Sequence, residues 1–117
     1  MGYIPQVAHT YSYKDGSYGL QNEHQLSIGE STCDARLGLK GVPIAFGGFA
    51  LFDITALSRI ALQRCKTSRC AVELMGALSE KYGFYGGEDN DWNVKGGMDN
   101  DGEGGETLTV ADGDEVW

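Results

Sequence analysis

The sequence contains few basic residues and no long apolar run. Lysine and arginine together number 9 against 17 aspartate and glutamate residues, so the chain of 117 residues carries a formal net charge of −8. Such a charge repels the phosphates of nucleic acids and anionic membrane surfaces. A membrane-spanning helix needs about 20 consecutive apolar residues, and the sequence has no such run. We therefore expect no nucleic-acid partner and no membrane span, and the sequence leaves the cellular compartment open.

Cysteine and histidine are also scarce. The three cysteines are Cys33, Cys65 and Cys70, and none lies in a Cys-x-x-Cys pair or at zinc-ligand spacing from one of the two histidines. The sequence thus excludes the common zinc motifs and implies no cofactor. Cys65 and Cys70 lie across an expected helix-to-helix turn, which makes a disulfide feasible, but two buried free thiols are the favoured interpretation.

Proline is rare, with 2 residues, whereas the chain has 18 glycines, a third or more of them between 86 and 105. Hydrophobic residues make up 41% of the chain and aromatic residues 10%. These values are typical of a globular chain, and its length allows one domain at most, with a small core.

The segment 18–33 predicts a β-hairpin. Its polar part, 22–25, begins with Asn22, which tolerates turn dihedrals and whose side chain can bond its own backbone. The second strand alternates, with Leu26 and Ile28 on the same face. It ends in the run Glu-Ser-Thr-Cys (30–33). Four functional side chains in a row at a strand end are typical of the rim of a functional site.

Two further strands are expected. Residues 9–13 form a strand that enters a turn at 14–17, where Asp-Gly is a strong turn signal. With the hairpin this gives three adjacent antiparallel strands. Residues 107–117 form a strand and the start of its hairpin partner, because apolar residues alternate before an Asp-Gly turn.

Two consecutive helices are expected at 54–82. Asp53 is a good N-cap for a helix over 54–65, in which apolar residues recur at helical spacing. Thr67 caps a second helix that runs to Tyr82, and Gly83 is placed to end it in a left-handed conformation. The wide apolar stripes predict that both helices pack on the sheet.

Residues 86–106 are rich in glycine and carboxylates and poor in apolar side chains. Such a segment buries too little surface to offset its ordering entropy, so we expect a loop. The alternative is a weak calcium site, since Asp99, Asp101 and Glu103 match positions 1, 3 and 5 of a calcium-binding loop. The bidentate glutamate expected at position 12 is replaced by Val110.

Five segments carry a specific pattern: Tyr-Ile-Pro-Gln-Val-Ala-His-Thr-Tyr (3–11), Gly-Ser-Tyr-Gly-Leu-Gln-Asn-Glu-His-Gln-Leu-Ser-Ile-Gly-Glu-Ser-Thr-Cys (16–33), Leu-Ser-Arg-Ile-Ala-Leu-Gln-Arg-Cys (57–65), Glu-Lys-Tyr-Gly-Phe-Tyr-Gly (80–86) and Leu-Thr-Val-Ala-Asp (108–112). In order and spacing they resemble the middle of a C69-type cysteine dipeptidase, the family of dipeptidase A and secernin. This family belongs to the N-terminal-nucleophile hydrolases. The resemblance covers nearly the whole chain apart from 87–105.

The resemblance implies an α+β fold, as part of an αββα sandwich in which helices cover two stacked antiparallel sheets. It also implies a cysteine that becomes the first residue after processing, attacks the peptide carbonyl and uses its own α-amine as base. In the family that cysteine lies upstream of the segments found here. The 117 residues alone are therefore expected to be inactive, and the rest of the hydrolase fold or another chain is expected to complete the sheet.

The resemblance also implies site residues. Asn22 matches the family's Asn-Glu turn and is a candidate for substrate binding. Thr32 lies where related acylases place an asparagine on the oxyanion side, and Ser31 is a second candidate for that role. Glu30 is a candidate partner for the ammonium group of a dipeptide. We expect Glu30 and Thr32 on the strand face opposite Leu26.

Two functions from different classes are compatible with the sequence. The first is a dipeptidase-like peptide hydrolase acting on a dipeptide or small amide, with its nucleophile outside these residues. The second is a non-catalytic family member that serves as a binding or assembly element through unpaired sheet edges. Cys33 as the nucleophile is a further alternative, but a buried thiol at a strand end is the preferred interpretation.

Overall fold

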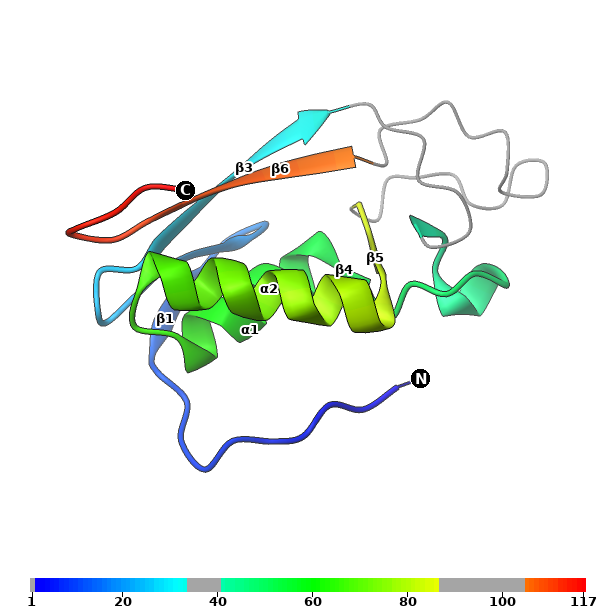
Figure 1. The fold of residues 1–117 in the computed structure, drawn as a ribbon, viewed down its shortest axis with the longest axis horizontal. Coiled ribbons are helices and arrows are strands. Elements are labelled where there is room, and N and C mark those ends of the chain that lie inside the picture. Colours follow the sequence, from blue (N-terminus) through cyan, green and yellow to red (C-terminus); the bar gives the residue numbers. More distant parts are fainter. Residues whose placement is uncertain (1, 34–40, 87–104) are drawn as a thin grey trace.

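A four-stranded antiparallel sheet is covered on one face by two helices (Figure 1). The computed structural model describes residues 2–33, 41–86 and 105–117. The α+β fold with an antiparallel sheet and two consecutive helices is thereby confirmed. In sheet order, the strands are β1 (Tyr13–Asp15), β2 (Gly19–Asn22), β3 (Ser27–Cys33) and β6 (Gly105–Ala111), and the helices are α1 (Ile54–Arg64) and α2 (Ser68–Tyr82).

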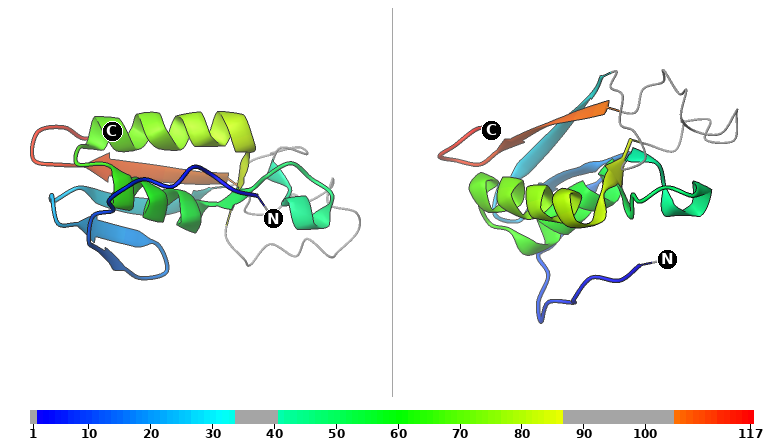
Figure 2. Two further views of the ribbon diagram at one scale, coloured as in Figure 1. Left: turned by 90° about the horizontal axis from the view of Figure 1, so that it is seen from below. Right: turned by 45° about the vertical axis from the view of Figure 1, so that its right-hand side comes forward.

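The two faces of the sheet differ because the side chains of β3 and β6 alternate between them. The strands pair over seven residues, from Ser27 opposite Ala111 to Cys33 opposite Gly105. Leu26, which directly precedes β3, Ile28 of β3 and Val110 of β6 are buried beneath the helices. Every second residue lies on the opposite face, which the described residues leave open. Figure 2 shows the helices on the same side of the sheet.

Helix α1 begins as predicted and lies close against β2. The Asp53 side chain accepts a hydrogen bond from Ala56 N in the first turn. At the strand, Gly19 N donates to Ser58 Oγ at 3.1 Å, and a Cβ added at Gly19 would lie 2.8 Å from Leu62 Cδ1. Any larger residue at this position would force the buried Leu62 side chain to shift, so glycine favours this close approach of strand and helix.

Helix α2 packs on β6 and has the predicted N-cap, since the Thr67 side chain accepts from Cys70 N. Ala71, Met75 and Leu78 form its buried stripe. Gly83 ends the helix with φ 68° and ψ 158°. The positive φ was expected, but the extended ψ is not left-handed helical, because the chain turns directly into the next strand.

The turn between β2 and β3 is organised by Asn22, as predicted. Asn22 Oδ1 accepts hydrogen bonds from His24 N at 3.0 Å and Leu26 N at 3.2 Å. The positive φ of the turn, 65°, occurs at Gln25 and not at the asparagine.

A second turn, after β6, is also held by a polar side chain that accepts hydrogen bonds from amides of its own turn. Asp112 Oδ1 accepts from Asp114 N at 2.8 Å and from Glu115 N at 2.9 Å. Its other oxygen, Oδ2, accepts from Ser68 N at 2.6 Å at the start of α2. These three backbone donors, Ser68 first, hold the pKa of Asp112 well below its usual range.

Several predicted boundaries were wrong. The first strand begins at Tyr13, not at residue 9, and Asp15 of the expected turn still belongs to it. Strand β6 begins at Gly105, two residues before the predicted start. The sequence also did not indicate a short parallel pair, β4 (Phe52–Asp53) with β5 (Phe84–Tyr85), nor the 3-10 turn η2 (Ile44–Phe46). Two-residue strands are too short to produce a periodic pattern.

The favoured interpretation of the cysteines was wrong. Cys65 and Cys70 form a disulfide between the end of α1 and the first turn of α2, with their Cα atoms 5.5 Å apart. Cys33 is free and exposed, not buried. Its place at the end of β3 on the open face of the sheet explains the exposure.

Candidate functional site

The rim residues at the end of β3 alternate between the two faces of the sheet. Glu30 is paired with Leu108 and lies two residues beyond Ile28, so it follows the helix-covered face. It is half-buried. The expectation that Glu30 lies on the face opposite Leu26 and Ile28 was therefore wrong, because the strand period of two places all three on the same side. For Thr32 the structure gives the backbone pairing alone, with Glu106.

The open face carries small polar side chains in this region. Ser31 and Cys33 are exposed, and Thr107 lies opposite Ser31 on β6. Cys33 Sγ and Thr107 Oγ1 are 3.3 Å apart, in hydrogen-bond contact. With Thr109, which is also exposed, these residues form a patch of hydroxyl and thiol groups without a large side chain. A flat face of this kind leaves the strand backbones accessible to a second layer or to a ligand.

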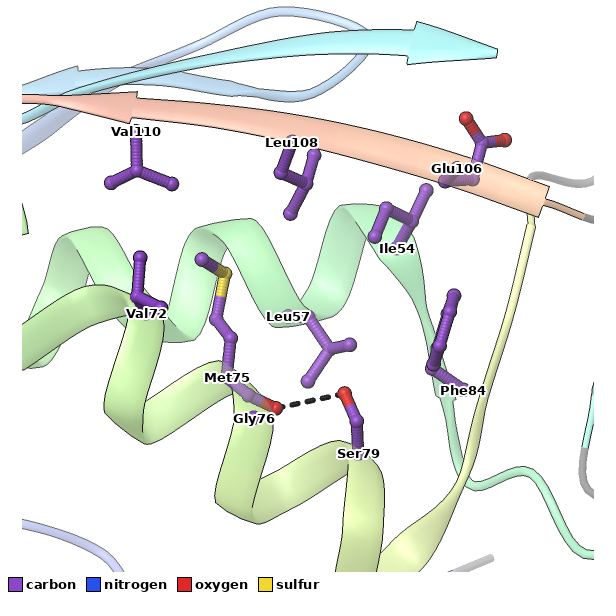
Figure 3. Close-up of a pocket in the computed structure, with 10 residues that line it drawn as sticks. All are labelled: Ile54, Leu57, Val72, Met75, Gly76, Ser79, Phe84, Glu106, Leu108 and Val110. Carbon is purple, nitrogen blue, oxygen red and sulfur yellow. Dashed lines mark hydrogen bonds between the residues drawn. The ribbon is translucent and has the colours of Figure 1, made fainter. Parts of the chain in front are cut away.

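The helix-covered face contains an apolar cavity of about 220 Å³ between α2 and β6. Figure 3 shows Met75 from α2 and Leu108 and Val110 from β6 on its walls, with Phe84 at one end. Glu106 lies at the same end of β6 and contributes the one carboxylate of the lining. The polar Ser79 is satisfied by the carbonyl of Met75 at 2.8 Å. The cavity and the rim residue Glu30 thus share one face of the sheet.

Asn22 lies inside the fold rather than at the rim. Its side chain is only 6% exposed. The Nδ2 group donates to Leu62 O at 2.9 Å and to Cys65 O at 2.7 Å, while Oδ1 binds two amides of its own turn. Nδ2 thus joins the hairpin to the end of α1, and Oδ1 holds the turn itself. Its role in substrate binding stays a prediction and receives no support from this placement.

The calcium candidates Asp99, Asp101 and Glu103 lie outside the described residues. Within the described ranges, no group of three His, Cys, Asp or Glu side chains is placed to hold a metal ion. Over the same ranges, neither helix is long and apolar enough to cross a bilayer.

Comparison with protein-family models, with curated proteins and with solved structures found no match to this chain. Functional inference therefore depends on the segment resemblance and on the geometry described above.

Sequence reasoning missed Thr107 and Thr109 as neighbours of the rim. A usable signal was present, because the run Thr-Leu-Thr-Val at 107–110 alternates like Ser-Ile-Gly-Glu at 27–30. What the sequence lacks is the pairing itself, since 74 residues separate Cys33 from Thr107.

Proposed function

We propose that this chain contributes the central sheet and helix pair of a dipeptidase-like peptide hydrolase of the C69 cysteine type. The observation that carries the proposal is that two of the resembling segments are paired in the sheet: 16–33 contains β3, and 108–112 contains the end of β6, which pairs with β3. Two others, 57–65 and 80–86, include most of α1 and the end of α2, on one face of that sheet. Segments that resemble one family in order along the chain are thus also neighbours in space.

In the proposed enzyme the open face of the sheet lies toward the second sheet of an αββα sandwich. Its small side chains at Ser31, Cys33 and Thr107 suit close packing of a second layer and leave room for a substrate near the strand ends. Nothing in the described residues covers this face with apolar side chains. The helix-covered face, in contrast, is already occupied by α1 and α2.

The proposed chemistry is acyl transfer to a cysteine followed by hydrolysis. The cysteine thiolate, on polypeptide outside these 117 residues, attacks the carbonyl carbon of the peptide bond, and water then releases the acyl group. The oxyanion that forms in each step needs donors about 2.7 to 3.1 Å away. Ser31 offers a hydroxyl on the open face, and the backbone N–H or hydroxyl of Thr32 is the second candidate. Glu30 lies on the other, helix-covered face of β3, so its pairing with the substrate ammonium is a separate proposal that requires the ammonium group to reach around the end of the strand.

The test uses the complete natural polypeptide that contains these residues, assayed with dipeptides whose amino terminus is free or acetylated. We expect hydrolysis of the free dipeptides. Ser31→Ala should lower kcat by about 10² with little change in KM, because a lost oxyanion donor acts in the transition state. Ser27→Ala, on the same face of β3 but at its other end, is the matched control and should leave the kinetics unchanged.

Glu30→Gln separates substrate binding from chemistry. It should lower kcat/KM for dipeptides with a free amino terminus by the equivalent of about 1 to 3 kcal/mol, the range for a lost charge-assisted hydrogen bond. The kcat/KM for acetylated dipeptides should not change. Equal losses for both substrates would show that Glu30 acts on the fold. Absence of dipeptide hydrolysis by the complete polypeptide would contradict the proposed function.

A binding or assembly element is the second candidate function. It is favoured by three large apolar side chains on the segment 42–50, Ile44, Phe46 and Phe49, which are 47%, 49% and 65% exposed. This reading predicts a complete polypeptide without hydrolase activity that changes its sedimentation coefficient when Phe49 is replaced by Ser. Activity together with unchanged sedimentation would exclude it.

A further inference from the structure

The corner between α1 and α2 is closed by the disulfide Cys65–Cys70. Cys65 is 1% exposed, whereas Cys70 is partly exposed. A thiol reagent therefore meets Cys70 first. Of the four residues between the two cysteines, Lys66, Thr67 and Arg69 are exposed and Ser68 is buried.

The β2–β3 turn, held by Asn22, and the turn after β6, held by Asp112, both contact this corner. Asn22 Nδ2 donates to Cys65 O at 2.7 Å, on the α1 side. Asp112 Oδ2 accepts from Ser68 N at 2.6 Å, on the α2 side. The two contacted backbone groups, Cys65 O and Ser68 N, lie within the short loop that the disulfide closes.

We propose that the Cys65–Cys70 disulfide is a redox-sensitive device that fixes the two sheet turns, and that its reduction loosens them without unfolding the domain. Cys65 O and Ser68 N are held in place by the corner. The disulfide limits the backbone dihedrals that the corner can adopt. Once the bond is cut, the corner samples more conformations, and the docked turns lose the fixed partners of Asn22 and Asp112. The inference does not depend on the proposed function.

The chemistry balances with a dithiol as reductant. A thiolate of the dithiol attacks Cys70 Sγ, forms a mixed disulfide and displaces the Cys65 thiolate, which takes up a proton. The second thiol then attacks the mixed disulfide, releases the Cys70 thiol and leaves as a cyclic disulfide. Two electrons pass from the dithiol to the protein, and the two cysteines end as thiols.

The test is amide hydrogen exchange of the full chain with and without dithiothreitol, after alkylation with iodoacetamide has established the thiol count. Without reductant, only Cys33 should be alkylated. After reduction, exchange should accelerate on the order of fivefold or more at His24 and Leu26, whose amides are held by Asn22. The amides of Asp114 and Glu115, held by Asp112, should respond in the same way.

Internal controls are the amides of Ile44 and Ala50, which are bonded within the segment 42–50, away from the corner. They should not respond to reduction. Cys70→Ala should exchange rapidly at the turns with or without dithiothreitol, and Cys33→Ser should respond like the wild type.

Three results would overturn the proposal. The first is alkylation of all three cysteines in the unreduced protein, and the second is unchanged exchange at both turns after reduction. The third is an equal acceleration at Ile44 and Ala50, since that would mean global unfolding rather than a local release.

Discussion

Two turns of this sheet are each held by one polar side chain that also binds the end of a helix, but the side chains differ. At the β2–β3 turn, Asn22 binds two amides of its own turn and then reaches the end of α1. At the turn after β6, Asp112 binds two amides of its own turn and then reaches the start of α2. Each side chain uses one oxygen for its turn and its remaining polar atom for a helix.

The difference between the turns follows from the helix ends that they contact. The last carbonyls of a helix have no intrahelical donor and need N–H groups, which an amide supplies and a carboxylate does not. The first amides of a helix need an acceptor, and a negative charge is favoured there by the helix dipole. Asn22 and Asp112 are therefore matched to α1 and α2, respectively, and are not interchangeable.

The strongest test of this match is Asn22→Asp. The substitution keeps the shape of the side chain but places a carboxylate beside the carbonyls of Leu62 and Cys65 in a buried position. We expect a loss of about 3 to 5 kcal/mol of unfolding free energy at pH 7, because a buried charge would lack a partner. Urea denaturation measures it. Gln21→Glu, on the same strand but exposed, should change stability by less than about 0.5 kcal/mol.

Removal of the disulfide should have the next largest effect. Cys70→Ala releases a loop with a sequence separation of 5. The chain-entropy model gives about 2 kcal/mol for a loop of this size. The thermal midpoint of the variant should fall and should no longer respond to dithiothreitol. A midpoint equal to that of the oxidised wild type would mean that the helix corner is held by packing alone.

Asp112→Asn should destabilise less, and its effect should depend on pH. The pKa of Asp112 is lower in the folded protein than in the unfolded chain, where it is about 3.8. Its charge therefore stabilises the fold fully at neutral pH, and this contribution is lost as the pH falls below about 4 toward the folded-state pKa. The stability difference between wild type and variant should accordingly be larger at pH 7 than at pH 3. A difference that does not vary with pH would assign the effect to geometry.

Arg69→Ala should have the smallest effect. Arg69 pairs with Glu115 at 2.9 Å and lies 4.7 Å from the ring centroid of Trp117, next to the Asp112 turn. Both partners of the ion pair are exposed, so water and salt screen it. We expect no resolvable change in the urea midpoint at 0.15 M salt. A clear loss would show that the second turn is held by its exposed ion pair as well as by Asp112.

The sequence predicted those features that a few neighbouring residues determine. The N-caps Asp53 and Thr67, both helices and the turn at Asn22 belong to this group. The sequence did not predict that Asn22 would be buried against α1, because that contact joins residues about 40 positions apart. The face of Glu30 was mistaken although the period of two was readable, because its assignment followed the strand end and the family resemblance and not the alternation from Leu26.

For the candidate site, the run at 30–33 was located correctly at a strand end, but its neighbours were not. Thr107 and the cavity beside Leu108 arise from the pairing of β3 with β6, and a single sequence does not encode strand pairs in a local pattern. Ser31 is exposed on the open face, and its role on the oxyanion side stays a prediction.

The exposed apolar segment 42–50 has a consequence for the behaviour of the protein in solution. The segment has no charged residue, and its backbone is bonded to itself, for example from Ala50 N to Val42 O at 2.9 Å. These bonds fix the backbone of the segment, so the side chains of Ile44, Phe46 and Phe49 stay exposed to solvent. At low ionic strength the net charge of −8 keeps neighbouring molecules apart. At about 1 M salt the screening length falls to about 3 Å, and sulfate strengthens apolar contact. Colloidal stability should consequently be highest in dilute salt, and ammonium sulfate should precipitate the protein early.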